Sequence, residues 1–165
     1  MTKMVPKMLE INSQTSMCKN LINIINILSR HGVKAAYIFG SQKDAGIAFL
    51  NGNFPMIDEK ADLDIGVLFE KLPEDAFEAY GEIYADLSIL FEPFRVDLVF
   101  LQETGVLFQY EAILGELVHC DDESFLEAYE ETVLKKASDL SFKKTDFERD
   151  FLEAIKDGYF EIAHR

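Results

Sequence analysis

Three aspartates lie in segments whose other residues are typical of β-strands. Asp62 and Asp64 belong to ADLDIGVLF, residues 61–69, and Asp97 belongs to FRVDLVFL, residues 94–101. Side chains two residues apart on a strand point to the same face, so Asp62 and Asp64 share a face. Two carboxylates repel each other unless a cation lies between them, and their oxygens suit hard divalent ions such as Mg²⁺. The pattern predicts a metal site if a neighbouring strand brings Asp97 beside them.

An alternative is that residues 61–69 form an edge strand whose aspartates face water, which is an ordinary arrangement. Asp97 weakens this alternative, because apolar residues flank it on both sides and an unpaired buried carboxylate is costly. We therefore expect the strand that contains Asp97 to be buried and to lie beside the strand of Asp62 and Asp64.

The apolar run before these strands breaks at Gly40-Ser41, within AYIFGSQ, residues 36–42. Glycine lets the backbone come close to a ligand, and a helix that starts just afterwards offers N–H groups to an anion. Gly-Ser pairs occur in many turns. The prediction of a phosphate site therefore depends on the order: strand, Gly-Ser, strand with Asp-x-Asp, strand with Asp. Lys43 is either a further phosphate ligand or a solvated lysine.

Apolar periodicity and turn residues predict a small sheet flanked by helices, an α/β arrangement with a helical C-terminal region. A first helix is expected from a cap at Asn12 or Ser13 to His31-Gly32. We expect strands at 33–39, 62–67 and 94–101, part of a helix and then a loop over 42–60, helices at 73–91, 105–116, 123–136 and 145–160, and a short link at 117–120. The stripe formed by Phe147, Phe151, Ile155 and Tyr159 is interpreted as core rather than interface.

Length and charge limit the function further. The 165 residues suit one domain, 1–165. A formal net charge of -14 opposes binding to nucleic acid and to anionic lipid, whereas it would attract a basic protein partner. No apolar run approaches the roughly 20 residues that cross a bilayer. Two cysteines make neither a disulfide framework nor a CxxC metal site, so we expect a cytoplasmic protein.

Three motifs together carry a family resemblance: FGS at 39–41, DLD at 62–64 and VDLV at 96–99. They resemble the signature of the DNA polymerase beta-like nucleotidyltransferases. Within that superfamily the chain is similar to the minimal nucleotidyltransferases (MNT), whose members include antitoxins encoded with HEPN-domain toxins. The segment 109–139 also looks like the region that follows the catalytic strands in this family, so the resemblance covers about 33–139.

The resemblance implies a site in which Gly40 and Ser41 hold a nucleoside triphosphate while Asp62 and Asp64 bind metal. Asp97 would be the third carboxylate, which helps to bind one metal and activates the attacking hydroxyl. Two Mg²⁺ ions and ATP are the implied cofactor and substrate, and AMP transfer to a tyrosine of a HEPN toxin is the implied reaction. Two ions that bridge phosphates and carboxylates can stabilise both the entering and the leaving oxygen.

Two features depart from the family pattern. The stretch between Ser41 and Asp62 is longer than usual, so residues 47–57 are interpreted as an insertion, and Gln42-Lys43 replace an arginine that often follows Gly-Ser. Two alternative functions therefore stay open: a binding module that neutralises a partner by contact alone, and a nucleotidyltransferase that modifies a small molecule such as an antibiotic.

Overall fold

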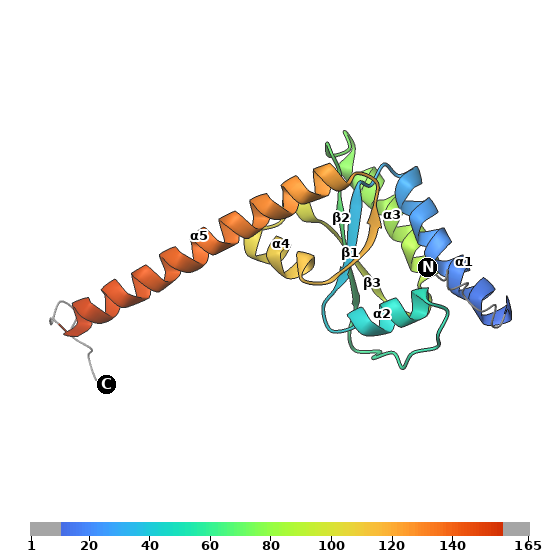
Figure 1. Ribbon diagram of the computed structural model, residues 1–165, viewed down its shortest axis with the longest axis horizontal. Coiled ribbons are helices and arrows are strands. Elements are labelled where there is room, and N and C mark those ends of the chain that lie inside the picture. Colours follow the sequence, from blue (N-terminus) through green and yellow to red (C-terminus); the bar gives the residue numbers. More distant parts are fainter. Residues whose placement is uncertain (1–10, 157–165) are drawn as a thin grey trace, which may run out of the picture.

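The computed structural model describes residues 11–156. Its sheet has the strand order β3-β2-β1-β4 and comprises β1 (Ala35–Phe39), β2 (Leu63–Leu68), β3 (Val96–Phe100) and β4 (Glu116–Cys120) (Figure 1). β1 is antiparallel to both β2 and β4, whereas β2 and β3 are parallel. The sheet is therefore mixed. β2 is a central strand, so the edge-strand alternative for the Asp62 segment is wrong.

Helices cover both faces of this sheet. They are α1 (Ile11–Arg30), α2 (Lys43–Leu50), α3 (Ala76–Leu90), α4 (Val106–Ile113) and α5 (Glu123–Lys156), with a short 3-10 turn at Leu101–Glu103. α1 and α3 pack on one face, and α4 with the beginning of α5 packs on the other. This arrangement confirms the predicted α/β class with a helical C-terminal region.

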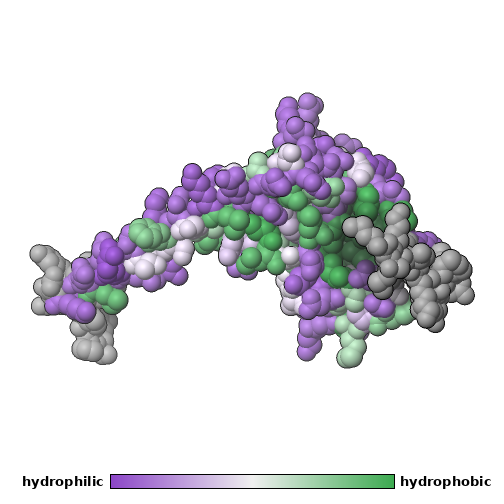
Figure 2. All heavy atoms as spheres, viewed as in Figure 1, coloured by the Kyte–Doolittle hydropathy of each residue, from purple (hydrophilic) through white to green (hydrophobic). Residues whose placement is uncertain are grey.

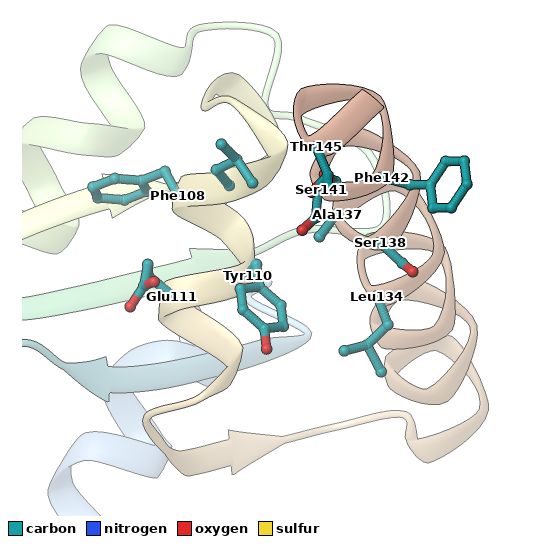
Figure 3. Close-up of a pocket in the computed structure, with 10 residues that line it drawn as sticks. Phe108, Tyr110, Glu111, Leu134, Ala137, Ser138, Ser141, Phe142 and Thr145 are labelled. Carbon is teal, nitrogen blue, oxygen red and sulfur yellow. The ribbon is translucent and has the colours of Figure 1, made fainter. Parts of the chain in front are cut away.

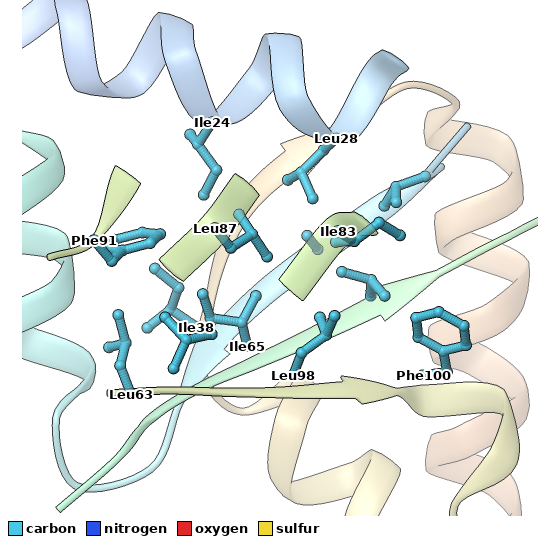
Figure 4. Close-up of a cluster of buried hydrophobic side chains, with 14 of the residues drawn as sticks. Ile24, Leu28, Ile38, Leu63, Ile65, Ile83, Leu87, Phe91, Leu98 and Phe100 are labelled. Atoms are coloured by element: carbon cyan, nitrogen blue, oxygen red, sulfur yellow. The ribbon is translucent and has the colours of Figure 1, made fainter. Parts of the chain in front are cut away.

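The larger core cluster lies between the sheet and the helices α1 and α3 (Figure 4). Each helix contributes residues spaced i, i+4, which therefore lie on one face: Ile24 and Leu28 from α1, and Ile83 and Leu87 from α3. They pack against residues from alternate positions of the strands, namely Ile38, Ile65 and Leu98. Burying an aliphatic side chain of this size stabilises the fold by about 1.5–3 kcal/mol. Because alternate strand residues fill this core, Asp64 and Asp97 face the opposite side of the sheet.

Several element boundaries differ from the sequence prediction. α3 begins at Ala76 rather than at Pro73, because the Asp75 side chain caps it by accepting a 2.9 Å hydrogen bond from the backbone N–H of Glu78. Asn12 and Ser13, the expected caps of the first helix, lie within α1 (Ile11–Arg30), so neither caps it. The predicted link at 117–120 is the edge strand β4, which pairs with β1 and is too short to show a clear alternation.

The two C-terminal helices predicted at 123–136 and 145–160 form one helix, α5, of 34 residues within the described part of the chain. No proline or glycine interrupts residues 123–156, so nothing in the sequence ends the helix between the two predictions. Figure 1 shows α5 extending past the body of the protein. Phe147 is 71% exposed, so its interpretation as core is wrong, while the side chains of Phe151 and Ile155 and the whole of Tyr159 lie outside the described residues.

No helix between residues 11 and 156 combines the length and the apolar character needed to span a membrane.

Candidate functional site

The end of β1 and the beginnings of β2 and β3 lie at the same end of the sheet. β1 is antiparallel to β2 with Phe39 opposite Asp64, and β2 is parallel to β3 with Asp64 opposite Asp97. This register places Gly40, the residue after Phe39, next to Asp64, with Asp97 on the strand beyond. Residues that are far apart in the sequence are brought together by strand pairing alone.

Gly40 and Asp64 are in close contact. Gly40 has a φ of +76°, a backbone conformation that L side chains rarely adopt. A Cβ atom added to Gly40 would lie 1.9 Å from the Oδ2 atom of Asp64, a distance that no structure tolerates. Only glycine therefore lets the chain turn here while the Asp64 carboxylate keeps its position.

The chain passes from Gly40 through an exposed Ser41 into the first turn of α2. The first N–H groups of a helix lack partners inside it and attract anions. Here they lie just after the glycine that contacts Asp64. Lys43 is in this first turn, with its side chain 33% exposed and its Nζ atom 3.9 Å from the Oδ1 atom of Asp44. A helix N-terminus that can bind an anion, beside the carboxylates of Asp64 and Asp97, is the arrangement expected for a metal-bound phosphate.

The raised pKa of Asp64 agrees with a cluster of carboxylates at this place. Burial raises the pKa of Asp64 above its ordinary value, and the negative charges of Asp97 and Asp62 raise it further. Asp97 itself is exposed, because β3 is an edge strand with no further strand beside it. The expectation that its strand would bury Asp97 is therefore wrong, although the expected juxtaposition with Asp64 is present.

Asp62 precedes β2 and its carboxylate is paired with an arginine. The Nε atom of Arg95 donates a 2.7 Å hydrogen bond to the Oδ1 atom of Asp62, and both side chains are partly exposed. Within residues 11–156, no three His, Cys, Asp or Glu side chains form a group already arranged to hold a metal ion. The donor set nevertheless suits Mg²⁺, since it offers carboxylate oxygens whose mutual repulsion a cation would relieve.

A buried glutamine holds the segment between the two motifs in place. Gln42 is only 4% exposed, its Nε2 atom donates to the carbonyl oxygens of Asp58 and Ala61 at 2.9 Å, and its Oε1 atom accepts from the N–H of Asp58 at 3.1 Å. Residues 51–62 therefore form a loop whose far end is tied to the residue after Ser41. Phe54 and Met56 in this loop are almost fully exposed.

Sequence reasoning missed Arg95 and the structural role of Gln42. Arg95 stands two residues before Asp97, so the period of two that linked Asp62 with Asp64 also predicts that Arg95 and Asp97 share a face. In the sequence, Gln42 stands out only as a departure from a family pattern. No local signal shows that its amide bonds to Asp58 and Ala61, because this depends on how the intervening loop folds back.

A separate apolar groove lies between α4 and α5 (Figure 3). It has a volume of about 940 Å³ and contains none of the predicted site residues. Leu107 and Phe108 of α4 and Leu134 and Phe142 of α5 are among its lining residues, and all four are 43–69% exposed. Figure 2 shows hydrophobic side chains gathered along the side of α5 that faces α4. An exposed apolar surface of this kind is typical of a protein contact.

Solved structures of toxin–antitoxin complexes share this fold. A toxin–antitoxin structure with AMP-PNP has 18% sequence identity and a TM-score of 0.59, covering 81% of this chain and 98% of its own. A tri-AMPylated Shewanella oneidensis HEPN toxin in complex with an MNT antitoxin has 17% identity and a TM-score of 0.56, covering 82% and 98%. Comparison with curated proteins gives no match.

The model of one protein family, described as "Polymerase beta, Nucleotidyltransferase", matches residues 22–124. This range is more than half of the chain and includes all four strands, Gly40-Ser41 and the three aspartates. The chain therefore belongs to the polymerase beta nucleotidyltransferase family.

Proposed function

We propose that this protein is a Mg²⁺-dependent nucleotidyltransferase that transfers AMP from ATP to a tyrosine hydroxyl of a HEPN-domain toxin and so acts as an antitoxin. The observation that carries the proposal is the register that sets Asp64 opposite Asp97 and against Gly40, directly before the start of α2. Metal-assisted nucleotidyl transfer requires a pair of carboxylates next to a site that binds the phosphates.

Each site residue has a role in this proposal. Gly40, Ser41 and the first N–H groups of α2 bind the triphosphate, with Lys43 at its edge, while Asp62, Asp64 and Asp97 would hold two Mg²⁺ ions. Bound Mg²⁺ would supply charge neutralisation at the phosphate oxygens. Asp97 accepts the proton of the acceptor hydroxyl. The hydroxyl oxygen forms a bond to the α-phosphorus as the bond from that phosphorus to the bridging oxygen of pyrophosphate breaks, and pyrophosphate leaves with those electrons.

The partner in this proposal is supported by three observations. One solved structure with the same fold is described as a tri-AMPylated HEPN toxin in complex with an MNT antitoxin, and another as a toxin–antitoxin with AMP-PNP. The groove between α4 and α5 exposes apolar side chains that suit a protein contact. The net charge of -14 favours association with a basic protein.

One observation favours the second candidate function, neutralisation of a partner by contact without catalysis. Asp62, which the reaction needs for metal, is occupied by Arg95 at 2.7 Å. If that ion pair persisted in the presence of metal and nucleotide, the site would be incomplete and only the binding surface would remain.

Transfer of label from ATP separates these functions. We expect incubation with ATP labelled at the α-phosphate, Mg²⁺ and the product of the neighbouring gene to label that partner, whereas ATP labelled at the γ-phosphate should not. Asp64→Asn should abolish the label but keep the complex intact. A stable complex that never acquires α-label would reject the enzymatic proposal in favour of neutralisation by contact.

A further inference from the structure

Arg95 is the cation that the structure places closest to the proposed metal ligands. Its backbone carbonyl accepts a 2.7 Å hydrogen bond from the N–H of Leu63, which extends the parallel pairing of β2 and β3 by one step. This bond sets Arg95 beside Asp62 at the beginning of the two strands. The 2.7 Å hydrogen bond from its Nε atom to Asp62 follows from this backbone position.

The side chain of Arg95 lies on the same side of the sheet as the carboxylates. Alternation along the strand gives Arg95 the face of Asp97, and both residues are exposed, whereas Val96 between them is buried. The guanidinium therefore stands at the mouth of the proposed nucleotide site. It offsets one of three neighbouring negative charges there.

Metal binding and the ion pair compete for Asp62. A carboxylate oxygen that ligates a divalent ion directly cannot keep the same hydrogen bond to Arg95, and the added positive charge repels the guanidinium. A triphosphate brings new negative charge to the same mouth. Arginine binds phosphate through several N–H groups at once, which makes it a suitable partner.

We propose that Arg95 is a positioning residue that holds Asp62 in the free protein and moves to a phosphate of the nucleotide when Asp62 binds metal. This inference rests on the proposed function, because it assumes that Asp62 is a metal ligand. Arg95 thus makes metal binding without nucleotide weaker and binding of the metal–nucleotide complex tighter. Metal and nucleotide would then enter together rather than singly.

Calorimetry with Mn²⁺ alone, and then with AMP-PNP at saturating Mn²⁺, tests this directly. Removing the competing ion pair in Arg95→Gln should tighten binding of Mn²⁺ alone by roughly two- to fivefold, the range of a partly exposed pair. The same variant should bind AMP-PNP about tenfold or more weakly, since a charged hydrogen bond to phosphate is lost. Arg95→Lys should restore part of the AMP-PNP affinity.

Arg30→Gln is the matched control, because Arg30 is similarly exposed and forms a 2.5 Å ion pair with Asp86. This ion pair does not involve any residue of the proposed site. The Arg30→Gln variant should leave both affinities unchanged. The inference is overturned if Arg95→Gln weakens binding of Mn²⁺ alone, or if it binds AMP-PNP as Arg30→Gln does. Neither readout needs AMP transfer, so a failed labelling experiment with this binding pattern intact would reject the proposed reaction and not the role of Arg95.

Discussion

At the scale of single residues, the site depends on the contact between Gly40 and Asp64. The glycine provides a left-handed turn and, by lacking a Cβ, leaves room for the carboxylate. Gly40 thus meets two requirements, a positive φ and the absence of a Cβ atom next to Asp64. Gly32 offers a comparison, because it has a similar φ of +72° but no atom within 4 Å of an added Cβ. Alanine variants of the two glycines therefore separate the cost of backbone strain from the displacement of the Asp64 carboxylate.

We predict that Gly40→Ala and Gly32→Ala each lose about 1 kcal/mol of stability from the strained backbone. Only Gly40→Ala should also lose binding of AMP-PNP with Mn²⁺, by at least about tenfold, because the methyl group displaces the Asp64 carboxylate. Thermal unfolding and calorimetry measure the two effects. Equal nucleotide affinity in the two variants would show that the contact with Asp64 is irrelevant to the site.

The raised pKa of Asp64 implies that the free site reduces stability. Because the pKa is higher in the folded than in the unfolded state, the folded protein loses stability as pH rises through that pKa. Without metal, we expect Asp64→Asn to raise the Tm by about 1–3 °C at pH 7, and the gain should vanish below about pH 3, where the carboxyl is protonated in both states. Asp139→Asn, at an exposed residue of α5, is the control. A lower Tm for Asp64→Asn than for the wild type at pH 7 would contradict this.

At the scale of elements, periodicity of two predicts the strands of Asp64 and Asp97, and the i, i+4 pairs such as Ile83 and Leu87 predict the helix that covers them. The parallel pairing of β2 with β3 could be expected because a helix connects them. The edge strand β4 could not, since five residues with a bulge in their pairing to β1 carry too little pattern. The exposure of Asp97 also depends on strand order, which no local sequence feature encodes.

The loop of residues 51–62 depends on one side chain for its attachment to the site. We predict that Gln42→Ala costs about 1–3 kcal/mol, since Asp58 and Ala61 lose their partners. Trypsin should then cleave after Lys60 faster, and AMP-PNP should bind more weakly. Both changes follow if the loop no longer stays against the beginning of α2.

Gln109→Ala is the matched control for this loop. Gln109 also uses its side chain in two hydrogen bonds, donating to the carbonyl of Thr104 at 2.8 Å and accepting from the Tyr129 hydroxyl at 2.9 Å, but it lies on α4. It should lower stability without exposing Lys60 to trypsin. Equal cleavage after Lys60 in the two variants would mean that general destabilisation, rather than the Gln42 attachment, opens the loop.

At the scale of the whole molecule, the candidate site and the apolar groove lie on different surfaces. The strand edge gathers Asp62, Asp64 and Asp97 in a protein of net charge -14, so a nucleotide can bind there only with cations. The groove between α4 and α5 is apolar and contains no proposed catalytic residue. The proposed function therefore places chemistry and partner contact on different surfaces, so we expect a substitution at the carboxylates to abolish transfer and leave the complex intact.

Binding of AMP-PNP, measured by calorimetry with and without a divalent ion, tests most directly whether the three aspartates and Gly40-Ser41 form a single metal–nucleotide site. We predict that the wild-type protein binds AMP-PNP only when Mg²⁺ or Mn²⁺ is present, and that Asp62→Asn, Asp64→Asn and Asp97→Asn each weaken binding by about tenfold or more. Asp139→Asn, at an exposed residue of α5, should bind as the wild type does. Metal-independent binding, or wild-type affinity in Asp64→Asn and Asp97→Asn, would contradict the site.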